Sequence, residues 1–151
     1  MSAEYNSKHG LVSRPPYELF MAFTDMRNFK QMLPEDKRES VSATYDTIET
    51  SYNGFKIGVK VVDRVPFSRL ELEDDNAPFH FGITIHFDEA PEARTDFSIN
   101  LHANLNLMMR SLLGNKIKEA LDKVVDGLVA VSEGRVPEGM NPSDFPGNFN
   151  F

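Results

Sequence analysis

Histidine is the side chain best suited to acid–base and metal chemistry near neutral pH, and two of the four histidines of this chain lie in one stretch, FHFGITIHF (79–87). Odd positions of the stretch are apolar and even positions are polar or small, which predicts a strand with one buried face. His80 and His86 both lie on the polar face. They are about 20 Å apart along a strand that rises about 3.3 Å per residue, which is too far for the two rings to bind one metal ion.

A cross-strand pair is the second arrangement in which these histidines could do chemistry. If the turn between residues 88 and 94 is centred near Pro91, His80 lies opposite His102 of the next strand and His86 lies opposite Asp96. Two paired imidazoles can hold a divalent metal. However, the spacing forces no carboxylate or cysteine to join them, and their face of the sheet is solvated. We therefore expect a surface pair of histidines and no metal site.

The first strand carries the other candidate for chemistry, His9. Tyr5 and Leu11 set the apolar direction of this strand, and Ser7 and His9 share it because alternate side chains point the same way. No Asp or Glu of a clearly patterned strand points to the apolar side, so His9 alone is available as a general base or as a polar anchor for a ligand. The alternative is a histidine whose hydrogen bonds are satisfied at the edge of the core.

Sequence motifs add no catalytic machinery to these residues. The chain has no G-x-S-x-G nucleophile elbow, no H-E-x-x-H zinc motif, no phosphate-binding P-loop and no G-x-G-x-x-G dinucleotide loop. We therefore expect no cofactor, and no catalysis is evident.

Composition limits the class of protein further. The 151 residues suit one domain, and the net charge of −7 argues against binding to nucleic acid or to anionic membrane surfaces. The absence of cysteine excludes disulfides and thiolate ligands. No apolar run approaches the roughly 18 residues of a spanning helix, so we expect no membrane insertion. The N-terminus MSAEYNSKHG has no apolar signal-peptide core, and the cytoplasm is the expected location.

The hydrophobic period of the N-terminal part predicts one strand and two short helices. Residues 5–12 predict the strand, and residues 13–23 predict a helix that is capped by Ser13 and has two prolines in its first turn. Asp25 is expected to cap the second short helix, which Pro34 ends.

The rest of the chain predicts a meander of strands and then one long helix. Between residues 41 and 105 the period is two, and the Asn-Gly pair at 53–54 is the strongest signal of a two-residue hairpin turn. From 107 to 133 the period is 3.6, with Asn106 as the expected N-cap and Gly134 as the stop, which predicts a helix about 40 Å long. The expected apolar stripe of this helix is Met109, Leu113, Ile117, Leu121, Val124, Leu128 and Val131.

The sheet with one apolar face and the helix with one apolar stripe bury these surfaces most simply against each other. The predicted fold class is α+β: a curved antiparallel sheet of about seven strands wrapped around the long C-terminal helix, with two short helices after the first strand. We expect residues 97, 99 and 101 of the sheet to contact residues 109, 113 and 117 of the helix. The helix carboxylates expected on its solvated face are Glu119, Asp122 and Asp126.

This order of elements resembles the START/Bet v 1-like superfamily, the helix-grip fold. The stretches that carry the resemblance are YNSKHGLVSRPPYELFMAFTDMRNFKQMLP, NGFKIGVKVVDRVPFSRLELE and FSINLHANLNLMMRSLLGNKIKEALDKVVDGLV. Together with the strand between them they cover roughly residues 4–131, and they are similar to small bacterial proteins of the SRPBCC or polyketide-cyclase-like group. The resemblance implies a cavity between sheet and helix for lipids, sterols, polyketides or other apolar ligands, in which a minority of members catalyse reactions.

The expected function is therefore the binding or carriage of a small hydrophobic, lipid-like or polyketide-like ligand. One alternative is an enzyme of cyclase or dehydratase type that uses the same cavity, with His9 as its base. Another is a module that binds a protein partner. The residues expected to line the cavity are Tyr5, Ser7, His9, Phe55, Ile57, Val59, Phe81, Ile83, Ile85, Phe97, Ile99, Leu101, Met109, Leu113 and Ile117.

The last 17 residues differ in composition from the domain that the resemblance covers, which we take as residues 1–134. The segment 135–151 is rich in proline and glycine and contains three phenylalanines. Proline and glycine oppose a continuing helix, whereas the aromatic residues favour packing on an apolar surface. That surface is expected to belong to this domain or to a second copy in a homodimer. A flexible tail is the alternative.

Overall fold

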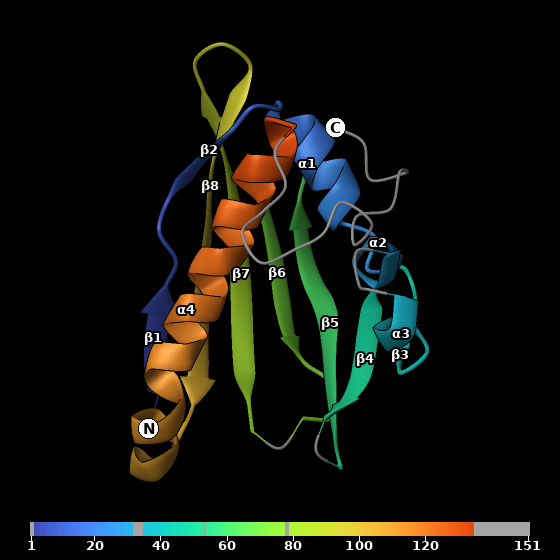
Figure 1. The fold of residues 1–151 in the computed structure, drawn as a ribbon, viewed down its shortest axis with the longest axis vertical. Helices are drawn as coiled ribbons and strands as arrows, with labels where there is room; N and C mark the ends of the chain where they lie inside the picture. Colours follow the sequence, from blue (N-terminus) through green and yellow to red (C-terminus); the bar gives the residue numbers. More distant parts are fainter. Residues whose placement is uncertain (1, 32–34, 53, 78, 135–151) are drawn as a thin grey trace.

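The computed structural model describes residues 2–31, 35–52, 54–77 and 79–134, which form one sheet, one long helix and three short helices (Figure 1). The strands are β1 (Ser2–Asn6), β2 (Gly10–Val12), β3 (Val41–Ala43), β4 (Thr47–Tyr52), β5 (Phe55–Val65), β6 (Arg69–Asp74), β7 (Phe81–Ala90) and β8 (Arg94–Asn104). The helices are α1 (Pro16–Phe23), α2 (Arg27–Gln31), α3 (Glu35–Arg38) and α4 (Leu107–Ser132).

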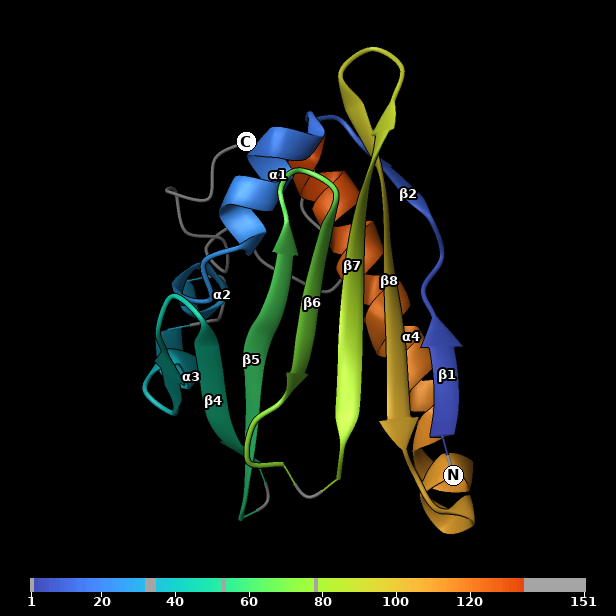
Figure 2. The ribbon, with the colours of Figure 1, turned by 180° about the vertical axis from the view of Figure 1, so that it is seen from behind.

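The strands form one antiparallel sheet in the order β1-β8-β7-β6-β5-β4-β3, and β2 follows β1 along β8. α4 packs along β1, β2 and β8, and α1 packs on β7 at the same face of the sheet (Figures 1 and 2). We call this the inner face and the opposite side the outer face. The predicted α+β architecture is confirmed. Over the described residues the sheet has eight strands, because the predicted first strand is broken in two.

Two of the three helix caps that the sequence predicts are present in the structure. Asn106 caps α4 as predicted, with its side-chain oxygen accepting from the Met109 N–H (2.8 Å), and Gly134 follows the helix at φ 76°. Asp25 likewise accepts from the Arg27 N–H at the start of α2 (3.0 Å). Ser13 is not the cap of α1, because the helix starts later, with Pro15 at the N-cap position.

Two further helix features depart from the prediction. The four-residue helix α3 follows the expected end of the second helix at Pro34, which itself lies outside the described residues. In α4, Val125 is fully buried and Val124 is exposed. The stripe that faces the sheet is therefore displaced by one residue there.

The two long hairpins differ in how well the sequence predicts their register. Tyr52 pairs with Phe55 across the predicted turn, where Gly54 has φ 78°, while Asn53 lies outside the described residues. In the β7–β8 hairpin Ala90 pairs with Arg94, so the turn is centred on Glu92.

This shift of one residue in the centre of the turn moves the β7–β8 pairing by two residues. Glu92 and Ala93 have φ of 65° and 54°, left-handed conformations that few residues other than glycine adopt. The predicted pairing of His80 with His102 is wrong. His102 pairs with Gly82, where an added Cβ would collide with the imidazole, and the carbonyl of His80 accepts from the Asn104 N–H (2.8 Å).

The break between β1 and β2 is a bulge that reverses the alternation of side chains. Asn6 pairs with Asn100 and Gly10 pairs with Phe97, so three residues lie opposite two. Before the break Tyr5 faces α4, where an added Cβ on Gly114 would lie 3.4 Å from the phenol oxygen. After it, Gly10 faces α4 and Leu11 is exposed. The common direction predicted for Tyr5, His9 and Leu11 is wrong for this reason.

Side chains of α4 and the backbone of β8 hold this bulge in place. The Lys8 N–H donates to Asp122 Oδ1 (2.7 Å), and Lys8 Nζ lies 2.7 Å from Asp126 Oδ1. Ser7 Oγ accepts from the Ile99 N–H (2.8 Å). Two carboxylates that the sequence places on a solvated helix face therefore fasten the bulge to α4.

Replacing Asp122 with alanine is expected to lower the free energy of unfolding by about 1–2 kcal/mol, because the Lys8 N–H loses a charged acceptor. This N–H, together with the Lys118 ammonium, holds the pKa of Asp122 below its ordinary value of 3.8. A depressed folded-state pKa stabilises the fold above the unfolded-state pKa, and this contribution disappears as the pH falls through the folded-state value.

Urea denaturation of wild type and Asp122→Ala at about pH 7 and about pH 3 measures both effects. Glu119→Ala, an exposed carboxylate on the same helix, is the matched control and should stay within about 0.5 kcal/mol of wild type. A difference between Asp122→Ala and wild type that does not shrink on acidification would contradict the assigned role.

The core lies between α1, the C-terminal half of α4 and the adjoining ends of β6, β7 and β8. Phe97 and Phe87 are almost fully buried with ring centroids 5.7 Å apart, and Phe23 of α1 packs on both. Arg64 of β5 ties the sheet to the segment after α1 by donating to Thr24 Oγ1 (2.6 Å) and to the Thr24 carbonyl (2.9 Å).

Candidate functional site

The inner face changes from a filled core near α1 to partly buried apolar side chains at the end where α4 begins. Three of the residues expected to line a cavity, Ile85, Phe97 and Ile99, are buried in the core. The side chain of Phe55 is not among those described. The expected apolar or aromatic residues that are half-buried are Tyr5, Ile57, Val59, Phe81, Ile83, Leu101, Met109, Leu113 and Ile117.

This gradient arises because α4 lies along the β1–β8 side of the sheet. Its main contacts among the described residues are with β1, β2 and β8, while α1 contacts β7 and α2 contacts β3 and β4. The contacts expected between sheet and helix are therefore only partly right. Phe97 packs on Phe23 of α1, with 5.6 Å between ring centroids. Leu101 and Ile117 pack at the margin of the core, and Leu113 is half-buried outside it.

The start of α4 adds apolar surface to this region. Leu107, Met108 and Leu112 are among the most exposed large apolar side chains that the structure describes. Together with the half-buried residues of the inner face they make up the accessible apolar surface that is described for this end of the domain. We call this set the inner apolar site.

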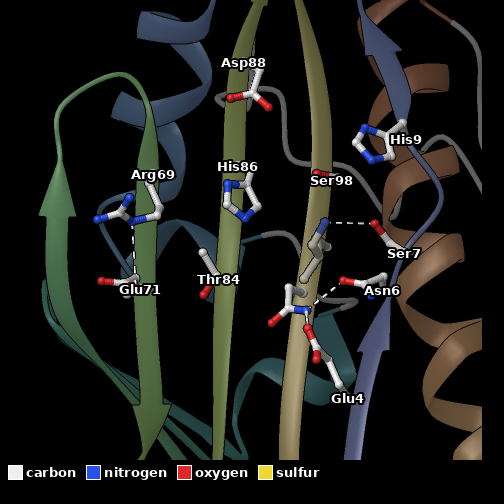
Figure 3. A pocket seen from close by; sticks show the side chains of 12 residues that line it. Glu4, Asn6, Ser7, His9, Arg69, Glu71, Thr84, His86, Asp88 and Ser98 are labelled. Carbon is white, nitrogen blue, oxygen red and sulfur yellow. Dashed lines mark hydrogen bonds and ion pairs between the residues drawn. The ribbon is translucent and has the colours of Figure 1, made fainter.

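The outer face carries a polar hollow of about 590 Å³ that crosses β1, β8, β7 and β6 (Figure 3). We call it the outer groove. Its lining residues are Glu4, Asn6, Ser7, His9, Arg69, Glu71, Thr84, His86, Asp88, Ser98, Ile99 and Asn100.

Two residues that the sequence assigns to the apolar cavity, Ser7 and His9, line the outer groove instead. His9 is exposed, and its Nδ1 lies 2.8 Å from Asp96 Oδ1. The predicted position of His9 in an apolar cavity is wrong, because the bulge between β1 and β2 turns the residue to the other face. Ser7 is buried and bonds the backbone of β8, so its role in the structure is to hold the bulge.

The floor of the outer groove contains residues that the sequence analysis did not bring together. His86 and Ser98 are directly paired across β7 and β8, and Thr84 lies two residues along β7 on the same face. The available signal was the run of short polar side chains at even positions in both strands. The register error of two residues concealed the pairing, and the flanking strand β1 is far from this hairpin in the sequence.

Neither face shows a metal centre. Among the described residues no group of three or more His, Asp or Glu side chains is arranged to hold a metal ion. In the same part of the chain, no helix combines the length and the apolar character that crossing a bilayer requires.

No model of a known protein family matches the chain, and no curated protein matches it in sequence. Solved structures do match its fold. A protein from Thermobifida fusca superposes with a TM-score of 0.66 at 11% identity, covering 87% of this chain and 93% of that one. Norcoclaurine synthase from Thalictrum flavum gives 0.61 at 7% identity, covering 83% and 87%. An HSP90 activator from Plasmodium falciparum gives 0.50 at 18% identity, covering 78% and 89%.

These likenesses, together with the topology, show that the chain has the START/Bet v 1-like helix-grip fold. At such low identities they establish the fold alone. The C-terminal segment 135–151 lies outside the described residues, so its packing on the domain and a homodimer formed through it both stay predictions.

Proposed function

We propose that the protein binds a small hydrophobic ligand at the inner apolar site. The observation that carries this proposal is the gradient of burial on the inner face. Ile85 and Ile99 are buried toward α1, whereas Ile83 and Leu101, the next residues on the same strands and face, are half-buried. A ligand that covers this accessible apolar area gains about 25 cal/mol of binding free energy for each Å² that it removes from water.

The chemistry of the walls defines the ligand class. The described side chains of the inner apolar site are mainly aliphatic and aromatic, so the ligand is held mostly by its apolar surface. Met108 and Met109 at the start of α4 are unbranched and adapt to ligands of different shape. A lipid-like or polyketide-like molecule fits these walls, and binding or carriage in the cytoplasm is the role that we propose.

Catalysis is the less favoured alternative. Norcoclaurine synthase shares the fold and is an enzyme by its name. In this chain the expected base, His9, lies on the outer face and contacts Asp96. A cyclase or dehydratase working at the inner apolar site would therefore need a different proton acceptor.

Titration with an apolar fluorescent probe tests the proposal. We expect micromolar binding, and Ile83→Asp should weaken it by more than about tenfold because a carboxylate in an apolar site costs several kcal/mol. Val62→Asp, on an exposed residue of β5, is the matched control and should bind as wild type does. Circular dichroism must show that both variants are folded.

A folded Ile83→Asp variant that binds the probe with wild-type affinity would overturn the assignment of the site. In that case the exposed apolar residues of α4 become a candidate surface for a protein partner, which is the second of the two alternative functions. Light scattering of the purified chain with and without a candidate partner then measures that association directly.

A further inference from the structure

The outer groove is a second candidate binding site, on the side of the sheet opposite the inner apolar site, and it is lined mostly by polar side chains. Its floor is formed by β7 and β8, and its sides are β6 and the bulged segment between β1 and β2 (Figure 3). The residues at the centre of the floor, Thr84 and Ser98, are short. Longer side chains stand around them, so the face is hollow there.

Ser98 is the most informative residue of the floor. Its side chain lines the hollow, yet the residue is only 8% exposed. Its hydroxyl has no hydrogen-bond partner among the described residues, and neither has the half-buried imidazole of His86, which pairs with it across the two strands. The Ser98 oxygen is not one of the fully buried side-chain atoms that lack a partner, so it reaches the hollow that the residue lines. Both groups are therefore open to a partner from outside the chain.

The charged side chains around the floor favour a partner with a positive charge. Three carboxylates line the outer groove, those of Glu4, Glu71 and Asp88, against the one guanidinium of Arg69. Asp88 has no ion pair among the described residues, and it lies directly opposite Asp96 on β8, whose carboxylate contacts His9 at 2.8 Å. Like charges facing each other across two strands are unfavourable. A cation bound at Asp88 from the groove would relieve this repulsion.

We propose that the outer groove binds a small organic cation through an ammonium group. An ammonium has three N–H donors, which match a carboxylate oxygen of Asp88, the hydroxyl oxygen of Ser98 and an imidazole nitrogen of neutral His86. One of these three acceptors is a serine hydroxyl, which is not among the usual protein ligands of zinc, and the described residues contain no group of three His, Asp or Glu side chains that could hold a metal ion. A hydrogen-bonded ammonium therefore suits them better than a coordinated metal ion.

Putrescine is the probe with which we would test this, by NMR titration of the full chain. We expect saturable shifts of backbone amides confined to residues 84–88 and 96–100. Asp88→Asn should weaken binding by about tenfold, the loss expected when a charge-assisted hydrogen bond is removed. Glu92→Gln, at the highly exposed tip of the same hairpin, makes the same change of charge outside the groove and should leave the affinity unchanged.

Ser98→Ala separates a binding role from a structural one. It should weaken putrescine binding several-fold, while the thermal midpoint stays level or rises, because the substitution removes no hydrogen bond among the described residues. A lowered midpoint with unchanged affinity would overturn the proposal, as would equal losses in Asp88→Asn and Glu92→Gln. Saturable binding of zinc in place of putrescine would also overturn it. None of these outcomes bears on the inner apolar site.

Discussion

Replacing Phe97 with alanine is expected to lower the free energy of unfolding by about 4 kcal/mol, because truncating a buried phenylalanine loses its transfer free energy and leaves a cavity. Phe97 is fully buried at the centre of an aromatic cluster, with Phe23 and Phe87 at 5.6 and 5.7 Å between ring centroids. Single domains are typically stable by about 5–15 kcal/mol, so this one change removes much of the total. Urea denaturation followed by circular dichroism measures it.

Phe67→Ala is the matched control for this prediction. Phe67 is 51% exposed and makes an edge contact with Phe20 at 5.8 Å. Its truncation should cost less than about 1 kcal/mol, since little buried area is lost. Similar losses in the two variants would show that the cluster around Phe97 is not the centre of the core.

Replacing Arg64 with methionine is expected to cost about 3 kcal/mol, because it leaves buried acceptors without their charged donor. The guanidinium donates to the hydroxyl and the carbonyl of Thr24, pairs with Asp46 at 2.7 Å and lies 4.3 Å from the ring centroid of Tyr45. The Arg64 side chain is only 25% exposed, so water replaces few of these contacts. Methionine keeps most of the apolar length of the side chain, which restricts the change to the polar contacts.

Arg27→Met supplies the comparison for Arg64. The Arg27 side chain is 62% exposed and pairs with Asp25, and exposed ion pairs are worth about 1 kcal/mol or less. Arg64→Lys should recover part of the stability, since an ammonium cannot reproduce the planar donor fork of arginine. Chemical denaturation of the three variants in one buffer decides the prediction. An Arg64→Met protein as stable as Arg27→Met would contradict it.

Local signals in the sequence were sufficient for the β4–β5 turn and for the long helix, although not for α3 or for the start of α1. The Asn-Gly turn, the Asn106 cap and the change of period near residue 106 act over a few residues, and the structure has each element where these signals place it. The apolar parity of β7 also holds, with Phe87 and Ile85 in the core. These features depend on backbone conformations that the residue types themselves favour.

The candidate sites depended on longer-range relations that the sequence does not display. The left-handed conformations of Glu92 and Ala93 set the register of β7 and β8, although neither residue is a glycine. The bulge at residues 7–9 is stabilised by Asp122, more than a hundred positions away in the chain. Without these two features the direction of His9 and the pairing of His86 with Ser98 cannot be predicted.

The bulge has a consequence for how the N-terminal segment tolerates insertions and deletions. Removing one of the three residues between Asn6 and Gly10 would leave two residues opposite two of β8, so that regular alternation would keep Gly10 facing α4 and Leu11 exposed. Gly10 would stay at the place where its missing side chain lets α4 approach: a Cβ there would lie 2.6 Å from Val125 Cγ1. A frame-preserving deletion of one codon in the bulge would therefore remove contacts of the bulge with α4 or β8 but preserve the facing of β2, whereas a substitution that adds a side chain at Gly10 would push α4 away from the sheet.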